Sequence, residues 1–376
     1  MDNLTHTLVG LAAARAGLER ASPYATAVCV VAANLPDADI IALLGGQWFY
    51  LEHHRGITHS IAGTLALALA LPVLFYYGER LIARLRGTEP RARLKGLLLC
   101  SLIVSASHPL LDWTNNYGVR PLLPWDGLRI YGDLVFILDP WLWLALGGSL
   151  FILVGVAKWR IALWALLGLT LTAAILFLPM RVGMEIPSTA RVLWVVGIAC
   201  VLILRRTGAG ARWGAAIPAT ALALVVVYWG TLSLLHARAF SHARENAQRL
   251  AGERNEDVLR LAAMPVLADP LTWRCLAETD RATLMFDLSL RPDGGAEVGN
   301  LYRVEKPEGE ARALVTSAAE DPRARVLLDF ARFPASKVAR ECAGATLVQF
   351  ADLRFTLPGD RSRGGSFALE VPVGAP

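Results

Sequence analysis

Charged residues are scarce in this 376-residue sequence, and their scarcity argues against an ordinary soluble protein. Asp, Glu, Lys and Arg make up 18% of the residues, whereas hydrophobic residues make up 55%. Soluble domains are usually about one quarter charged. The mean hydropathy is +0.43, and the apolar excess is concentrated before residue 236. The composition therefore predicts a membrane protein with a soluble C-terminal part.

Two other features are missing: cysteines with metal-binding spacing, and a basic, aromatic-rich pattern for nucleic acid. Three of the five cysteines, Cys29, Cys100 and Cys200, lie in apolar runs typical of packing residues. Cys275 and Cys342 could form a disulfide if the C-terminal part lies outside the cytoplasm. The net charge of +5 fits basic membrane loops, so we expect no nucleic-acid partner. The first six residues include an acid and form no basic n-region, which argues against a cleaved signal peptide.

Long apolar runs are what the sequence has instead. Six runs are candidates to span a bilayer: residues 61–77, 96–113, 134–157, 161–178, 192–204 and 213–235. Two earlier helical runs, residues 4–18 and 24–35, fall short of the ~20 residues that a span requires. We expect these two to be tilted, half-inserted or packed inside the bundle.

The basic loops predict the orientation of these spans. Residues 79–95, 158–160 and 205–212 are basic and alternate with less basic connections. The positive-inside rule therefore places these loops in the cytoplasm. The same topology places everything after His236 outside the cytoplasm.

The fold class that follows is an α-helical polytopic membrane domain with a C-terminal soluble α+β domain. We expect a transmembrane domain over residues 1–236, a linker helix over 237–264 and an extracytoplasmic α+β domain over 265–376. Short β-rich runs predict strands at residues 282–290, 301–304, 346–356 and 367–373, with a helix at 324–333.

Histidine and aspartate form four clusters within the first 113 residues, which contain five of the seven histidines. The clusters are His6; Asp37 and Asp39; His53, His54 and His59; and His108 and Asp112. The last pair is spaced i, i+4, which places both side chains on one helix face. The predicted topology brings all four clusters to the outer membrane face. Ionisable groups at a membrane are costly unless paired or bound, so we expect a metal site.

Imidazole and carboxylate ligands suit Zn²⁺, or else Mn²⁺ or Fe²⁺, and no thiolate lies nearby. More than four candidate ligands leave both one and two ions open. A divalent ion lowers the pKa of bound water and clamps a phosphoryl or acyl oxygen. Arg55 is either a partner for an anionic substrate or a snorkelling interface arginine. Thr58 and Ser60 are candidate donors to the ligands or helix caps, and Asp133 and Asp139 are reserve ligand candidates.

Four motifs together resemble a known family. They are Leu4-Thr5-His6, Leu35-Pro36-Asp37-Ala38-Asp39, His54-Arg55-Gly56-Ile57-Thr58-His59-Ser60 and His108-Pro109-Leu110-Leu111-Asp112. Over the first 140 residues the chain resembles the YdjM/YbcI-type family of bacterial inner-membrane, metal-dependent hydrolases. The ligand pattern alone is also similar in kind to that of zinc-dependent phospholipase C.

The family resemblance implies a multi-pass inner-membrane protein and a set of site residues. The implied metal ligands are His6, Asp37, His54, His59, His108 and Asp112. We take Asp37, Asp39 and Arg55 as candidates for catalysis, whereas His53 matches the motif less clearly.

The sequence thus predicts a membrane-bound, metal-dependent hydrolase. Its expected substrate is a phosphoester or another ester of a lipid or lipid-linked molecule, because the ligands lie at headgroup depth. Two alternatives stay open. A metal-ion transporter would hold its ligands near the bilayer midplane. A membrane-anchored sensor or structural protein would use its outer domain to bind a partner. The sequence specifies neither the substrate nor the oligomeric state.

Overall fold

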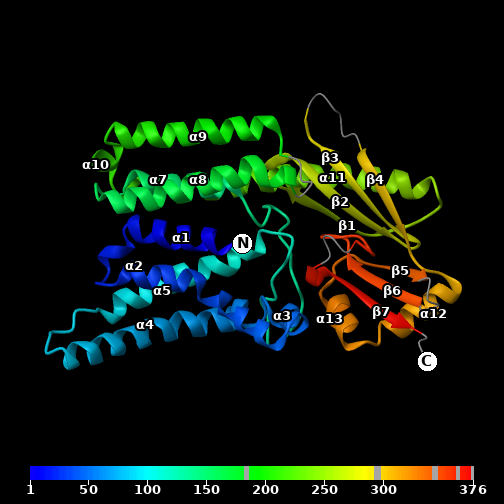
Figure 1. Cartoon of the computed structure of the whole chain (residues 1–376), viewed down its shortest axis with the longest axis horizontal. Helices are drawn as coiled ribbons and strands as arrows, with labels where there is room; N and C mark the ends of the chain where they lie inside the picture. The colour runs from blue at the N-terminus through cyan, green and yellow to red at the C-terminus, as the bar shows by residue number, and fades with distance from the viewer. Residues whose placement is uncertain (182–185, 292–297, 341–345, 361–364, 374–376) are drawn as a thin grey trace. The chain divides into compact units, whose positions relative to one another are not determined.

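The computed structural model describes residues 1–181, 186–291, 298–340, 346–360 and 365–373 (Figure 1). By its internal contacts the chain divides into two compact units. The first contains Met1–Ala38, Arg55–Leu234 and Pro265–Pro270. The second contains Asp39–His54, Leu235–Met264 and Leu271–Pro376. The segment Asp39–His54 thus belongs with the C-terminal residues, although it lies early in the sequence.

Six helices in the described parts of the chain are long and apolar enough to cross a membrane. They are Ala25–Gly45, α4 (Ile61–Leu85), α5 (Leu94–Trp113), Lys158–Phe177 within α8 (Lys158–Arg181), α9 (Ser188–Arg206) and α11 (Ala216–Gly252). The chain is therefore a multi-pass membrane protein, as its composition predicts. The first of these is longer than the sequence indicates, because 3-10 turns over Leu35–Gly45 extend α2 (Ala25–Asn34).

The predicted span at residues 134–157 is wrong in length. The chain there is helical only over Pro140–Ile152, as α6 (Pro140–Leu142), a π-helical turn (Trp143–Gly147) and α7 (Gly148–Ile152). Asp139 caps the start by accepting hydrogen bonds from the backbone of Trp141 and Leu142, and Pro140 occupies the first helical position. Both features mark a helix beginning, so the apolar residues before them do not join the helix.

Helices α1 (Asn3–Arg15), α2, α4 and α5 form a packed group in the first unit (Figure 1). Helix α2 contacts α1 and α5, and α4 contacts α5. Small side chains allow this close packing: Cys29 and Cys100 are fully buried among alanines. A Cβ on Gly10 would lie 2.7 Å from the Cys29 carbonyl oxygen, so α1 and α2 approach closely because this position is glycine.

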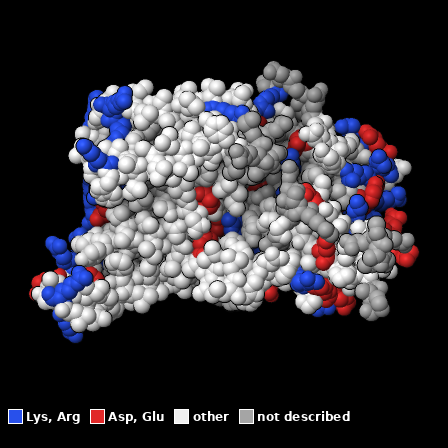
Figure 2. Space-filling view, viewed as in Figure 1, with Lys and Arg blue, Asp and Glu red and all other residues white. Residues whose placement is uncertain are grey.

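Basic side chains gather at one end of the helical unit (Figure 2). This end contains the connection from α4 to α5, the start of α8, and α10 (Ala209–Trp213) after α9. Uncharged side chains cover most of the helix flanks in the same view. The distribution agrees with the positive-inside pattern in the sequence.

The second unit contains two antiparallel sheets (Figure 1). One has the order β1 (Val258–Val266), β2 (Asp269–Thr279), β3 (Ala282–Ser289), β4 (Val298–Glu305); the other has β5 (Pro334–Arg340), β6 (Thr346–Asp352), β7 (Ala368–Val373). Helices α12 (Gly309–Ala318) and α13 (Pro322–Phe330) join the sheets in sequence, and α3 (Gln47–His53) packs against α13. The soluble part is thus the α+β fold that the sequence predicts.

The polar helix after the last span ends earlier than the sequence predicts. Helix α11 ends at Gly252, and β1 begins at Val258, inside the segment expected to be a linker helix. The sequence of β1 lacks the alternation of apolar and polar residues that indicates a strand, because Ala262, Ala263 and Met264 are buried in succession. Cys275 is buried in the core between the first sheet and α11, and Cys342 lies outside the described residues.

An ion pair between Glu256 and Arg303 makes the second unit sensitive to pH. Two hydrogen bonds of 2.6 and 3.0 Å join these side chains, and only 3% of the Glu256 side chain is exposed. The guanidinium of Arg303 lowers the pKa of the Glu256 carboxyl below its usual value. A lowered pKa stabilises the fold above the unfolded-state pKa of about 4.3. This contribution disappears as the pH falls through the folded-state pKa.

We therefore expect Glu256→Gln to lower the midpoint of thermal unfolding at pH 7, with the difference from wild type shrinking below about pH 4. Thermal unfolding of the full chain in detergent, followed across pH, measures this. Glu305→Gln is the matched control, because Glu305 bonds the same arginine but is 63% exposed. An equal effect of both changes at every pH would contradict the role of Glu256.

Candidate metal centre

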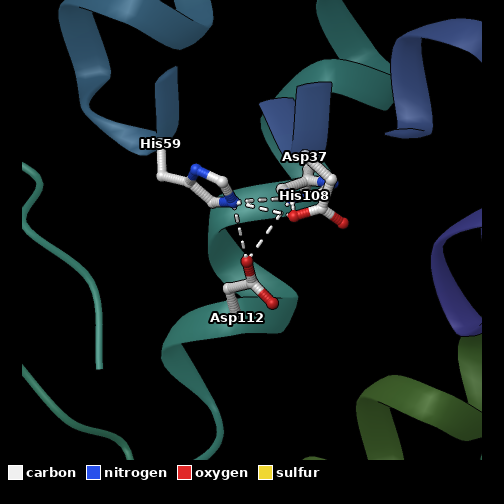
Figure 3. Close-up of side chains that lie close together, drawn as sticks. All are labelled: Asp37, His59, His108 and Asp112. Atoms are coloured by element: carbon white, nitrogen blue, oxygen red, sulfur yellow. Dashed lines mark hydrogen bonds and ion pairs between the residues drawn. The ribbon is translucent and has the colours of Figure 1, made fainter. Parts of the chain in front are cut away.

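Four ligand-type side chains meet where helices of the first unit begin or end (Figure 3). Asp37 follows the end of α2, and His59 lies in the 3-10 turn Ile57–His59 directly before α4. His108 and Asp112 occupy the last turns of α5. Because α2 and α5 end where α4 begins, the packed group brings all four to one place. This is the end away from the basic α4–α5 connection.

The distances between the ligand atoms match those around a small divalent ion. His59 Nε2 lies 3.1 Å from His108 Nε2 and 3.1 Å from Asp112 Oδ2. Asp37 Oδ1 lies 3.3 Å from His59 Nε2 and 3.5 Å from His108 Nε2, and the latter is 3.4 Å from Asp112 Oδ2. Ligands at ~2.0–2.1 Å from a tetrahedral Zn²⁺ would be about 3.3–3.4 Å apart. The donor set therefore fits such an ion without rearrangement.

Hydrogen bonding also prepares these side chains as ligands. His108 Nδ1 lies 2.6 Å from the Ala33 carbonyl oxygen, so it carries the proton and donates it. In the neutral ring Nε2 is then a free acceptor that faces the cluster. Asp112 Oδ2 is buried with the two imidazole nitrogens 3.1 and 3.4 Å away, yet none of the described residues makes a well-aligned hydrogen bond to it. Such an orphaned acceptor is unusual in a protein interior and is explained if it binds a cation.

His6 approaches the same carboxylate from its other oxygen. Its Nε2 lies 3.4 Å from Asp112 Oδ1, and its ring stacks on that of His108 with centroids 3.7 Å apart. Both nitrogens of this buried ring lack a hydrogen-bond partner among the described residues. His6 thus lies beside the four-residue cluster, next to Asp112 Oδ1 and the His108 ring.

Arg55 is buried, with 2% of its surface exposed, and contacts the same carboxylate. Its Nη2 lies 2.9 Å from Asp112 Oδ1, and its Nη1 donates to Asn115 Oδ1 at 3.0 Å. The guanidinium also lies over the Tyr117 ring, 4.7 Å from the centroid. Of the two interpretations open from the sequence, a snorkelling interface arginine is wrong. Arg55 orients Asp112 and places a positive charge beside it.

Comparison with known proteins places this region in a family. Residues 1–183 match the YdjM inner membrane protein family. The match confirms the family resemblance and includes all four residues of the four-residue cluster. A similar protein is the uncharacterized protein YfhP of Bacillus subtilis (strain 168), 26% identical over 153 residues. The alignment spans 39% of this chain and 44% of YfhP, less than half of either. No solved structure matches the chain significantly.

The other candidate residues of the YdjM region are not part of the four-residue cluster. His54 Nδ1 lies 2.9 Å from Asp39 Oδ1, and both belong to the second unit. His53 is half-exposed, with its Nδ1 2.9 Å from the Phe49 carbonyl oxygen. Asp133 is buried, and Asp139 caps α6 and accepts a hydrogen bond from the Tyr228 hydroxyl at 3.0 Å. The last two are therefore not members of the four-residue cluster.

Both hydroxyl residues beside His59 have local roles. Thr58 Oγ1 lies 3.0 Å from His59 Nδ1, which fits a residue that holds the imidazole. Ser60 caps α4 by accepting a hydrogen bond from the backbone of Gly63. The sequence did not indicate Asn115, whose buried Oδ1 accepts hydrogen bonds from Arg55 and from the backbone of Tyr117. The sequence feature that could have indicated Asn115 is its position three residues after Asp112.

Gly63 in the YdjM region sets the position of His59. A Cβ at this glycine would overlap the carbonyl oxygen of Ile57, at the start of the turn that carries His59. We expect Gly63→Ala to displace the turn and weaken metal binding by at least about tenfold. A metal titration of the purified protein measures this. Gly78→Ala in the same helix is the control, because a Cβ there meets nothing within 4 Å. Equal affinities in both variants would contradict this role.

Proposed function

We propose that the chain is a membrane-bound, metal-dependent hydrolase that acts on a phosphoester or another ester of a lipid or lipid-linked molecule. One observation carries the proposal: the side chains of His59, His108 and Asp112 are fully buried, whereas that of Asp37 is 12% exposed. Three protein ligands and a fourth position open to water are typical of catalytic zinc sites, whereas structural sites are closed. The proposal therefore takes Asp37 as the residue beside the open position and not as a fourth ligand.

Each residue of the cluster has a role in this proposal. A divalent ion at the site would supply Lewis-acid chemistry, because it lowers the pKa of a water and polarises a phosphoryl or acyl oxygen. His59, His108 and Asp112 would hold the ion. Asp37, at the accessible corner, accepts the proton from the attacking water as general base. Arg55 keeps Asp112 in its orientation through its Nη2 contact.

The charge beside Asp112 argues against a second ion on this carboxylate. Its Oδ1 contacts Arg55 Nη2. A second divalent ion on this oxygen would have to displace or face the guanidinium, at a high electrostatic cost. His6 therefore supports the site from beside Asp112 rather than holding a second ion.

The position of the cluster supports a lipid substrate. His59 lies directly before α4, and His108 and Asp112 lie in the last turns of α5. Lipid headgroups are found at this level, whereas a transporter holds its ions near the midplane. Basic side chains gather at the opposite end of the unit. The positive-inside rule then puts the cluster on the extracytoplasmic side of the inner membrane.

The test is hydrolysis by the purified full chain in lipid nanodiscs. We expect release of phosphate or headgroup from a panel of phospholipids and phosphatidic acid, loss of activity with a chelator, and recovery with Zn²⁺, Mn²⁺ or Fe²⁺. Hydrolysis that survives complete metal removal would overturn the proposal. Metal-dependent ion flux in proteoliposomes without any ester hydrolysis would favour a transporter instead.

A further inference from the structure

The first unit contains an apolar cavity that the metal chemistry does not use. It lies between the segment Pro140–Ile152, α8 and α9, and its volume is about 290 Å³. Residues of its wall include Trp143, Phe151, Trp164, Gly168, Trp194 and Val201. We call it the tryptophan groove. Its α8 and α9 walls come from the middle of two spanning helices, so it lies at hydrocarbon depth.

The indole N–H groups of Trp143 and Trp194 in the wall of the tryptophan groove are already bonded within the protein. The Trp194 indole donates to Thr172 Oγ1 at 3.1 Å, and Thr172 in turn donates to the Gly168 carbonyl at 2.7 Å. The Trp143 indole donates to Thr5 Oγ1 at 3.0 Å and lies near both carboxylate oxygens of Asp2. A polar ligand would lose its hydrogen bonds to water and find few new partners here, whereas a hydrocarbon chain has no hydrogen bonds to lose. The chemistry of the wall therefore selects an apolar chain.

Trp143 also links the tryptophan groove to the metal centre. Its hydrogen bonds go to the first turn of α1, where Asp2 caps the helix and His6 follows Thr5. A Cβ at Gly147, one turn after Trp143, would lie 3.8 Å from Leu8, one turn after Thr5. The groove wall and α1 thus run side by side in the same direction. One end of the groove lies at the level of the metal ligands, and the other lies deeper in the bilayer.

We propose that the tryptophan groove binds an acyl chain of the lipid whose headgroup reacts at the metal centre. This inference rests on the proposed hydrolase function and names its substrate class: a bilayer lipid with a long hydrocarbon chain. Leu169 and Leu202 in the groove wall are exposed on spanning helices, so the surrounding hydrocarbon reaches the groove and the substrate enters from the bilayer.

Glycine in the wall offers a direct way to fill the groove. A Cβ at Gly168 meets nothing within 4 Å, so Gly168→Leu places its side chain in the cavity without a backbone clash. Gly230→Leu is the matched control: Gly230 lies in α11, is exposed, and is equally open at Cβ. Unchanged metal content in both variants checks that the fold and the metal site are intact.

The binding experiment uses phosphatidic acid with a photoreactive diazirine in the middle of its acyl chain, incorporated in nanodiscs. We expect cross-links on α8 and α9 at the groove, and a roughly tenfold loss in Gly168→Leu, the factor expected when two methylene groups lose their burial. Gly230→Leu should cross-link like wild type. Equal cross-linking of the groove in all three proteins would overturn the proposal.

Kinetics separate this inference from the proposed function. Gly168→Leu should raise KM for a long-chain lipid about tenfold and leave KM for a water-soluble short-chain analogue unchanged. Groove cross-linking in a protein that hydrolyses no ester would support the acyl-chain site and contradict the proposed hydrolase function. Hydrolysis with the same chain-length preference in Gly168→Leu and wild type would contradict acyl-chain binding in the groove and support the proposed hydrolase function.

Discussion

Replacing His108 with alanine is expected to remove the metal ion from the purified protein and to abolish the proposed hydrolytic activity. In the proposed site His108 supplies one imidazole ligand, and its hydrogen bond to the Ala33 carbonyl holds the ring in the tautomer that can bind a cation. Loss of an outer hydrogen-bond partner alone typically costs 10–100-fold in metal affinity. Loss of the ligand itself should therefore exceed about 100-fold. Elemental analysis after gel filtration measures the bound metal.

His53→Ala is the control for this experiment. His53 lies in the same sequence cluster as His59 but is half-exposed, and its ring bonds only locally to the Phe49 carbonyl and stacks on the Phe49 ring. It should keep wild-type metal content and activity. Both variants should elute as the wild type does and keep its helix content. Wild-type metal content in folded His108→Ala would contradict the ligand assignment.

Replacing Asp37 with asparagine is expected to separate metal binding from catalysis. Asparagine keeps the size of the side chain and one oxygen but does not accept a proton. If Asp37 is the general base, the hydrolysis rate should fall by roughly 10²–10⁴-fold. The ion should stay, because His59, His108 and Asp112 remain buried around it. Metal content and steady-state kinetics of one preparation give both quantities.

Asp126→Asn is the matched control, because Asp126 is exposed and its carboxylate bonds the nearby backbone of Leu128. It should leave both quantities unchanged. Loss of the ion from Asp37→Asn would show instead that Asp37 is an essential fourth ligand. The site would then be closed and structural, and the sensor interpretation would gain support over the hydrolase.

The sequence predicted the membrane helices well because lipid imposes a simple rule on them. A span requires a long apolar run, and α4 and α5 begin or end close to where hydropathy places them. The rule failed at Pro140–Ile152, where an apolar run contains an internal helix start at Asp139. The β-rich runs in the sequence also failed to indicate β1, β2 and β5, because strands of the soluble unit depend on partners distant in sequence.

The metal-type cluster was partly foreseeable for a similar reason. The i, i+4 spacing of His108 and Asp112 fixes their common helix face, and the order of the spans predicts that Asp37 and His59 lie at the same membrane face. The pairing of Arg55 with Asp112 was not foreseeable, because it depends on the side-chain packing of a loop. Nor was the assignment of His54 and Asp39 to the second unit, which depends on how α3 packs against α13.

X-ray absorption at the edge of the bound metal tests the central claim most directly, because it reports the ligand atoms of the ion itself. For the wild-type protein we predict a first shell of nitrogen and oxygen at about 2.0–2.2 Å, with the outer-shell signature of two imidazoles and no sulfur. That signature should fall to one imidazole or vanish in His59→Ala. A purified, folded protein with no bound metal, or with thiolate sulfur in the first shell, would contradict the account.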